Sequence, residues 1–121
     1  AYSTNNSDKY LLAIGKAYLK LEDFSNAENY LLRTLDEIQT DDTEKECRFK
    51  LGEIYKNRNE LGNAEEQFLV IIEIDPGSAE AHYQLGEIYL ALNDPVHASS
   101  EFRKALLIDP NHYGARLRYY N

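Results

Sequence analysis

The sequence predicts an all-α protein, an α-solenoid of three helix-turn-helix repeats with a capping helix. The main observation is a string of apolar and small residues that occurs three times, 37 and then 34 residues apart. Within each copy the apolar residues recur every three or four positions, which is the period of an amphipathic helix. The 3 prolines all fall at predicted helix boundaries. We divide the chain into a frayed tail (1–7), repeat one (8–41), a connector (42–44), repeat two (45–78), repeat three (79–112) and a capping helix (113–121).

The third copy of the string is the clearest. It reads His82-x2-Leu85-Gly86-x2-Tyr89, then Ala98-x3-Phe102, then Pro110. The earlier copies read Leu51-Gly52-x2-Tyr55, Ala64-x3-Phe68 and Pro76, and before that Ile14-Gly15-x2-Tyr18 and Ala27-x3-Leu31. This spacing resembles the tetratricopeptide repeat (TPR) pattern, with His82 at the position where that family prefers tryptophan. The resemblance covers about residues 8–120 and implies three antiparallel helix pairs.

Small residues mark the places where the two helices of a predicted pair cross. Glycine inside a helix costs roughly 0.5–1 kcal/mol relative to alanine, so its recurrence requires a packing reason. Close approach of two helix backbones supplies that reason. We therefore predict that Gly86 contacts Ala98, and that Gly52 contacts Ala64 in the same way.

Repeat one follows a Ser- and Asn-rich tail that has no apolar period. Its first helix is expected to start near Ser7 or Asp8, because both residue types are good N-caps. The core face of this helix is predicted to consist of Leu11, Ile14 and Tyr18. Asp23 is expected to cap the second helix.

The junction between repeats one and two departs from the pattern. No proline closes repeat one, and three extra residues precede repeat two. Three residues make nearly one helical turn, so the second helix is expected to run one turn longer, to Gln39 or Thr40. Thr43 and Glu46 are then expected to form a capping box for the next helix.

Prolines and N-cap residues define the boundaries of repeats two and three. Asp75-Pro76-Gly77-Ser78 is expected to end the second helix of repeat two, with Ser78 as the N-cap of the next helix. Asp94 precedes Pro95, which suits the first position of a helix. Pro110 is expected to close repeat three.

The last residues, 113–121, open a further first helix. Tyr120 stands at the place of Gly86, and its bulk would prevent a second helix from crossing there. We interpret this segment as a capping helix over repeat three, as terminal repeats require, with Tyr113, Leu117 and Tyr120 facing inward. The alternative is a boundary inside a longer repeat array. The chain also begins at Ala1 and has no methionine, which indicates a processed form or a fragment.

Composition excludes several classes of function. No apolar run approaches the length that spans a bilayer, and a net charge of −8 argues against a nucleic-acid partner. The single cysteine, Cys47, excludes an internal disulfide and is expected to be a small core thiol. The three histidines, His82, His97 and His112, lack metal-ligand spacing, and no catalytic motif is present. We therefore predict no enzyme activity, no cofactor and no metal.

The resemblance implies a concave surface lined by the first helix of each repeat. The predicted groove-lining residues are Leu12, Lys16, Leu19, Phe49, Glu53, Lys56, Tyr83, Glu87, Leu90 and Leu117. Within each repeat they are spaced i, i+4 and i+7 and form one stripe per helix. The charges predict a groove that is basic near Lys9, Lys16 and Lys20 and acidic near repeats two and three. A mixed solvent-facing surface without a ligand is the alternative interpretation.

The predicted function is a non-catalytic adaptor or scaffold that binds a peptide or helix of a partner protein in this groove. The family's clamp for a C-terminal carboxylate uses Lys and Asn, and here Leu12 and Lys16 take those positions. A chaperone-tail co-adaptor is therefore not predicted. The alternative function is a self-assembly module that forms homo-oligomers through the groove or through the C-terminal helix with its exposed tyrosines.

Overall fold

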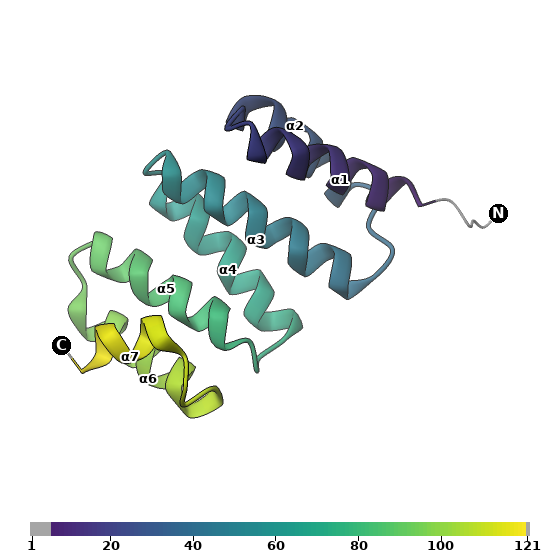
Figure 1. Cartoon of the computed structure of the whole chain (residues 1–121). Coiled ribbons are helices and arrows are strands. Elements are labelled where there is room, and N and C mark those ends of the chain that lie inside the picture. Colours follow the sequence, from purple (N-terminus) through teal and green to yellow (C-terminus); the bar gives the residue numbers. More distant parts are fainter. Residues whose placement is uncertain (1–5, 121) are drawn as a thin grey trace.

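The computed structural model describes residues 6–120, so residues 1–5 of the predicted tail lie outside the described part. These residues form helices and no strand, which confirms the all-α prediction. The helices are α1 (Ser7–Lys20), α2 (Phe24–Leu35), α3 (Asp41–Asn57), α4 (Leu61–Ile74), α5 (Ala79–Ala91), α6 (Pro95–Ile108) and α7 (Tyr113–Tyr119). They stack as the antiparallel pairs α1–α2, α3–α4 and α5–α6, and α7 packs on α6 (Figure 1).

The predicted N-caps of three helices are present. Asp23, Ser78 and Asp94 each accept a hydrogen bond from the backbone N–H three residues later. Ser7 was expected to be an N-cap or part of the tail. It is instead the first residue of α1, and Asn6 stands at the N-cap position. Each turn inside a pair also contains one residue in the left-handed region: Glu22, Asn59 and Asn93, with φ of 57°, 62° and 61°. The three hairpins are thus closed in the same way.

The extra turn between repeats one and two belongs to α3, and the prediction that α2 is extended was wrong. α2 ends at Leu35, and Thr40 accepts a hydrogen bond from the Thr43 N–H, so the cap lies at Thr40 and the Thr43 capping box does not form. Residues 42–44, expected as a connector, lie in the first turn of α3. The acidic side chains of this turn favour it electrostatically, because a helix N-terminus carries partial positive charge.

A buried carboxylate holds the chain between α2 and α3 out of the helix. Asp8 is 1% exposed, and its Oδ2 accepts a hydrogen bond from the Gln39 backbone N–H at 3.2 Å. The side chain of Asp8 therefore satisfies a backbone donor that an extended α2 would have used. This contact joins residues 31 positions apart, so helix periodicity does not reveal it.

Glycine and an aromatic ring shape the helix crossings of repeats two and three, whereas Gly15 in repeat one meets the Leu31 side chain. A Cβ atom placed on Gly86 would lie 2.5 Å from the Phe102 ring, and one on Gly52 would clash with the Phe68 ring. The atoms nearest to a Cβ at these two glycines belong to the phenylalanine ring, and the contact of each glycine with Ala64 or Ala98 stays a prediction. Ala64 and Ala98 are buried beside the crossings. The absence of a glycine side chain makes room for the ring.

The terminal helices present different faces to the core from those expected. In α1, Leu12 is 6% exposed whereas Ile14 is 38% exposed. The counterparts of Ile14 in the later repeats, Leu51 and Leu85, are buried, and α3 and α5 each pack on a preceding second helix. No helix within residues 6–120 precedes α1, so this side of α1 stays open to solvent.

The capping helix α7 contacts repeat three through a face that the sequence analysis did not select. Ala115 is fully buried and Tyr119 packs against the same cluster. Tyr113, Leu117 and Tyr120, expected to face inward, are 73%, 45% and 74% exposed. Ala115 is the counterpart of Ala81, which is also buried, so α7 keeps the repeat's own register.

Tyrosine–glutamate hydrogen bonds connect successive helix pairs. The Tyr55 hydroxyl donates to Glu28 at 2.9 Å, and the Tyr89 hydroxyl donates to Glu65 at 2.8 Å. Burial and the accepting carboxylate raise the pKa of each phenol to about 12. Arg58 also donates to Glu28, at 2.6 Å. The tyrosine that follows Leu-Gly in repeats two and three thus has a polar role as well as an apolar one.

Cys47 is expected to resist thiol reagents while the chain is folded. It is fully buried, its Sγ donates to the Leu31 carbonyl at 3.1 Å, and burial raises the pKa of its thiol to about 12. Because the thiolate is the reactive form, a disulfide reagent at mildly alkaline pH should react only after denaturant is added. Rapid reaction of the native chain, followed by absorbance, would contradict this packing.

Candidate functional site

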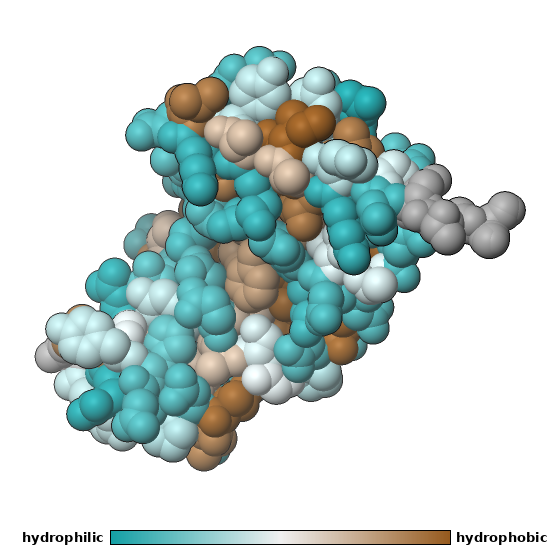
Figure 2. All heavy atoms as spheres, turned by 45° about the vertical axis from the view of Figure 1, so that its right-hand side comes forward, coloured by the Kyte–Doolittle hydropathy of each residue, from teal (hydrophilic) through white to brown (hydrophobic). Residues whose placement is uncertain are grey.

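The predicted groove residues lie along the first helices α1, α3, α5 and α7. Their side chains are not equally exposed to solvent. Leu12 is buried in the core, so it cannot line a groove. The half-buried members are Lys16, Leu19, Phe49, Lys56, Tyr83 and Glu87, and the exposed members are Glu53, Leu90 and Leu117. A space-filling view shows a hollow on one face of the molecule, with hydrophobic atoms at its base and hydrophilic atoms along its sides (Figure 2).

A pocket of about 520 Å³ lies between α3 and α5. Phe49 and Phe68 form its apolar part, with ring centroids 5.7 Å apart in an edge-on arrangement. The charged residues around it are Lys45, Glu46, Lys50, Glu53, Asp75 and Glu80. Two lysines and four carboxylates make this pocket acidic on balance. Its size is within the range of small-ligand and side-chain pockets.

A second pocket, of about 500 Å³, lies between α5 and α7. Its walls include Tyr83, Leu90 and Leu117, which are three of the predicted residues. Gly114 lies directly against the Tyr83 ring, since a Cβ there would be 2.7 Å from it. Burial raises the pKa of the Tyr83 hydroxyl, so this group stays protonated near neutral pH. The structure thus places Tyr83 and Leu117 together and leaves Phe49 to the neighbouring pocket.

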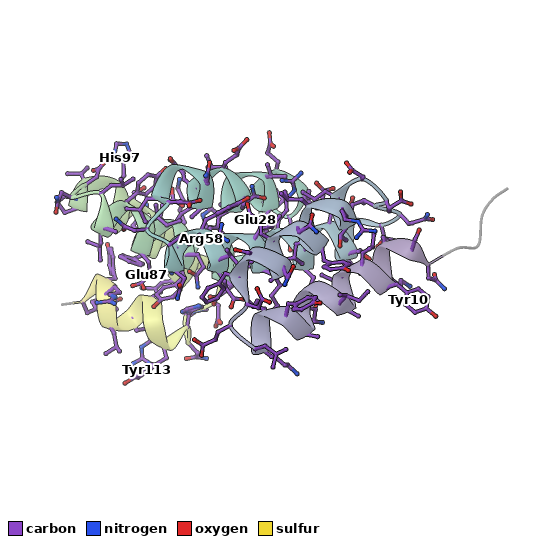
Figure 3. All side chains as sticks on the ribbon, turned by 90° about the horizontal axis from the view of Figure 1, so that it is seen from above. Tyr10, Glu28, Arg58, Glu87, His97 and Tyr113 are labelled. Atoms are coloured by element: carbon purple, nitrogen blue, oxygen red, sulfur yellow. The ribbon has the colours of Figure 1, made fainter. Side chains whose placement is uncertain are left out.

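Ion pairs and hydrogen bonds join neighbouring first helices across this face. Lys16 of α1 pairs with Glu46 of α3 at 2.5 Å, and Arg118 of α7 pairs with Glu87 of α5 at 2.6 Å. Glu87 accordingly points toward α7 (Figure 3). These side chains are partly exposed, so each pair contributes at most about 1 kcal/mol to stability. Their effect on the site is to neutralise charges that the sequence analysis counted as free.

Several residues that line the α3–α5 pocket were absent from the predicted set. They are Lys45, Glu46, Lys50, Phe68, Asp75, Ser78, Glu80 and Gln84. Glu80 and Gln84 precede Glu87 at i, i+4 and i+7, so they form a polar stripe beside the predicted apolar one. That periodicity was a usable signal. Phe68 carried no such signal, because its position in the A-x3-F string identifies it as core.

The histidines and carboxylates of the described residues serve other contacts. Within residues 6–120, no group of three or more His, Cys, Asp or Glu side chains is arranged to hold a metal ion. No helix in the same range is long and apolar enough to cross a membrane. His112 acts instead as the N-cap of α7, with its Nδ1 accepting from the Ala115 N–H and its Nε2 2.8 Å from Glu80.

Stacked antiparallel helix pairs whose first helices line one hollow face define the class of α-solenoid repeat proteins. Sequence models of the tetratricopeptide repeat match residues 11–46 and 79–112. The chain belongs to the tetratricopeptide repeat family. No curated protein matches the chain.

Solved structures share this fold. YrrB, described as a TPR protein with an unusual peptide-binding site, is 30% identical with a TM-score of 0.84, and the match covers 98% of this chain but 59% of YrrB. MamA is 23% identical with a TM-score of 0.84, over 95% of this chain and 65% of its own. The first TPR domain of Spaghetti (RPAP3), bound to the HSP90 peptide SRMEEVD, is 16% identical with a TM-score of 0.81, over 94% and 88%. At these lower identities MamA and RPAP3 show the shared fold alone.

Proposed function

We propose that this chain is a non-catalytic protein-interaction module, an adaptor or scaffold, that binds a segment of a partner protein across α3, α5 and α7. The observation that carries this proposal is the α3–α5 pocket, in which Phe49 is half-buried over Phe68 and surrounded by charged side chains. Aromatic residues in a partly enclosed pocket are typical centres of binding energy. The peptide-binding site in the description of YrrB, the relative with 30% identity, supports the same reading.

The chemistry of the pocket indicates what the partner segment would contain. An apolar side chain would fill the space over Phe49. Glu46, Glu53 and Asp75 are each paired with a lysine, so Glu80 is the carboxylate of this pocket that favours Lys or Arg in the segment. Toward α1 the exposed Lys9 and Lys20 favour acidic residues in the segment. Such charges set the direction of binding and the association rate more than the affinity.

An acidic C-terminal tail is a poorer fit to this face. The basic residue that the family's carboxylate clamp requires is replaced by Leu12, which is buried. Lys16, at the position of the clamp asparagine, is paired with Glu46. The HSP90 peptide bound by the RPAP3 domain is therefore not the kind of ligand that we propose here.

Substitution of the groove aromatics is expected to weaken binding of peptides selected against this chain from a displayed random library. Phe49→Ala and Tyr83→Ala should each cost about 1–2 kcal/mol of binding free energy, or about five- to thirtyfold in Kd. Glu53→Lys and Glu87→Lys should mainly slow association and change its salt dependence. Fluorescence anisotropy and stopped-flow mixing measure the two effects.

Leu69→Ala is the matched control for this experiment. Leu69 is an exposed apolar residue of α4 and lines neither groove pocket. Because Tyr83 also packs on Phe102 with ring centroids 5.8 Å apart, thermal melts must show that each variant is folded. If Leu69→Ala lowers affinity and the aromatic variants do not, the selected peptides bind another face and the proposed groove is wrong.

Self-assembly is the second candidate function, and the exposure of α7 favours it. Tyr113, Leu117 and Tyr120 form an exposed apolar face on this helix, and Tyr113 points away from the molecule (Figure 3). Sedimentation over a concentration series distinguishes the candidates. A monomer at all concentrations excludes self-assembly, whereas a dimer that Leu117→Ala dissociates would replace the adaptor proposal.

A further inference from the structure

A pocket of about 560 Å³ lies between α6 and α7, away from the residues that line the two groove pockets. Its apolar walls come from Leu106, Leu107, Tyr119 and Tyr120, and its charged residues are Arg103 and Arg116. No carboxylate lines it. Neither arginine forms an ion pair with any residue that the structure describes, although most of the other basic side chains have a partner.

The earlier repeats show what normally accompanies a side chain at the position of Arg116. In repeat two, Arg48 Nη1 donates to Gln67 Oε1 at 3.0 Å, and in repeat three, His82 Nδ1 lies 2.8 Å from Glu101 Oε1. Arg48, His82 and Arg116 follow one another at 34-residue spacing, and so do Gln67 and Glu101. In both repeats the second helix thus supplies an oxygen acceptor to this side chain of the first helix. Within residues 6–120, α7 has no second helix to do the same for Arg116.

Tyr120 prevents a regular second helix from filling this place. It stands 34 residues after Gly86, where even a Cβ atom would lie 2.5 Å from the Phe102 ring. A helix with the usual A-x3-F packing therefore cannot cross α7 as α6 crosses α5. The occupant of the pocket must differ in shape from a further repeat and must still offer an oxygen acceptor to Arg116.

We infer that the α6–α7 pocket is a second binding site, for an acidic segment of a partner protein. A Glu or Asp carboxylate of that segment takes the place that Gln67 and Glu101 hold in the earlier repeats and binds Arg116, with Arg103 beside it. Guanidinium–carboxylate pairs of this kind are strong and directional. An aliphatic side chain of the segment packs on Leu107 and Tyr120, which are both largely exposed. This site is basic where the α3–α5 pocket is acidic, so the two sites select different segments.

The test uses a short fluorescein-labelled peptide of glutamate and leucine, blocked at both ends, and a matched peptide with glutamine in place of glutamate. Fluorescence anisotropy should show binding of the glutamate peptide and at least about tenfold weaker binding of the glutamine peptide. Arg116→Gln should weaken binding of the glutamate peptide by about tenfold, and Arg103→Gln by a smaller factor. Lys104→Gln, which removes one positive charge from α6 next to Arg103 but outside the lining of this pocket, should change it less than about twofold.

Phe49→Ala is the control that separates this site from the groove. The inference requires that Phe49→Ala bind the glutamate peptide with the same Kd as the unmodified chain, even where it binds groove ligands more weakly. The inference would be overturned by equal binding of the two peptides or by no binding of either. It would also be overturned if Arg116→Gln had no effect or if Phe49→Ala lost binding. Self-association that Arg116→Gln abolishes, without peptide binding, would instead assign the pocket to a second copy of the chain and would also overturn it.

Discussion

Replacing Phe68 by alanine is expected to destabilise the fold by about 3–5 kcal/mol, because it removes a large buried ring and leaves a cavity. Phe68 is 1% exposed and lies directly on Gly52 of the preceding helix. Its ring also packs edge-on against Phe49. The loss therefore falls at the crossing of α3 and α4, the middle pair of the stack, which packs on α2 on one side and on α5 on the other.

Equilibrium unfolding in urea measures this effect, and Leu69→Ala is the control. Leu69 is the next residue of α4 and is 44% exposed, so its replacement should cost less than about 1.5 kcal/mol. The expected order is a much lower transition midpoint for Phe68→Ala than for Leu69→Ala. Similar midpoints for the two variants would show that Phe68 does not occupy the crossing.

The second large effect is expected for Gly86→Ala. An added Cβ would lie 2.5 Å from Phe102 Cε1, and the ring is itself buried, so either the ring or a helix must move. Overpacking of this kind costs about 1–3 kcal/mol. Alanine has the better helix propensity by about 0.8–1.0 kcal/mol, which offsets part of this cost. The net result should still be a loss of stability.

Gly62→Ala provides the matched control, because it has the same chemical change without the contact. Gly62 lies in α4, and nothing comes within 4 Å of a Cβ built there. This variant should therefore keep or slightly raise the melting temperature. A Gly86→Ala protein that melts at or above the temperature of Gly62→Ala would refute the close approach of α5 and Phe102.

The repeat architecture and the helix caps were predictable from sequence because both depend on local patterns. Leu-Gly-x2-Tyr and Ala-x3-Phe recur at the spacing of one helix pair, and each places its small and large residues on one helical face. The side chains of Asp23, Ser78 and Asp94 each cap a helix by accepting from the backbone N–H three residues later. Contacts of this range follow from residue type and spacing alone.

The candidate site was predictable only in part. Periodicity placed Phe49 and Tyr83 on the face that the structure hollows, and it identified Glu53 and Leu90 as accessible. It missed that Lys16 and Glu46 pair across 30 residues, because no periodicity within one helix relates the two side chains. It also missed the paired state of Glu87, whose partner Arg118 belongs to another repeat.

Tertiary structure alone decided the junction and the terminal faces. The buried Asp8 side chain accepts a hydrogen bond from the Gln39 backbone N–H, so Gln39 is not part of α2. The extra residues form the first turn of α3 instead. Sequence period identifies an amphipathic stripe but not how much of the helix circumference a neighbouring helix covers. α1 packs on α2 and α3 but on no preceding second helix, and α7 packs mainly on α6. Ile14 is therefore exposed although it matches the core pattern. On α7, contact with α6 buries Ala115, because burial is settled by which helix lies opposite and not by the hydrophobicity of the residue.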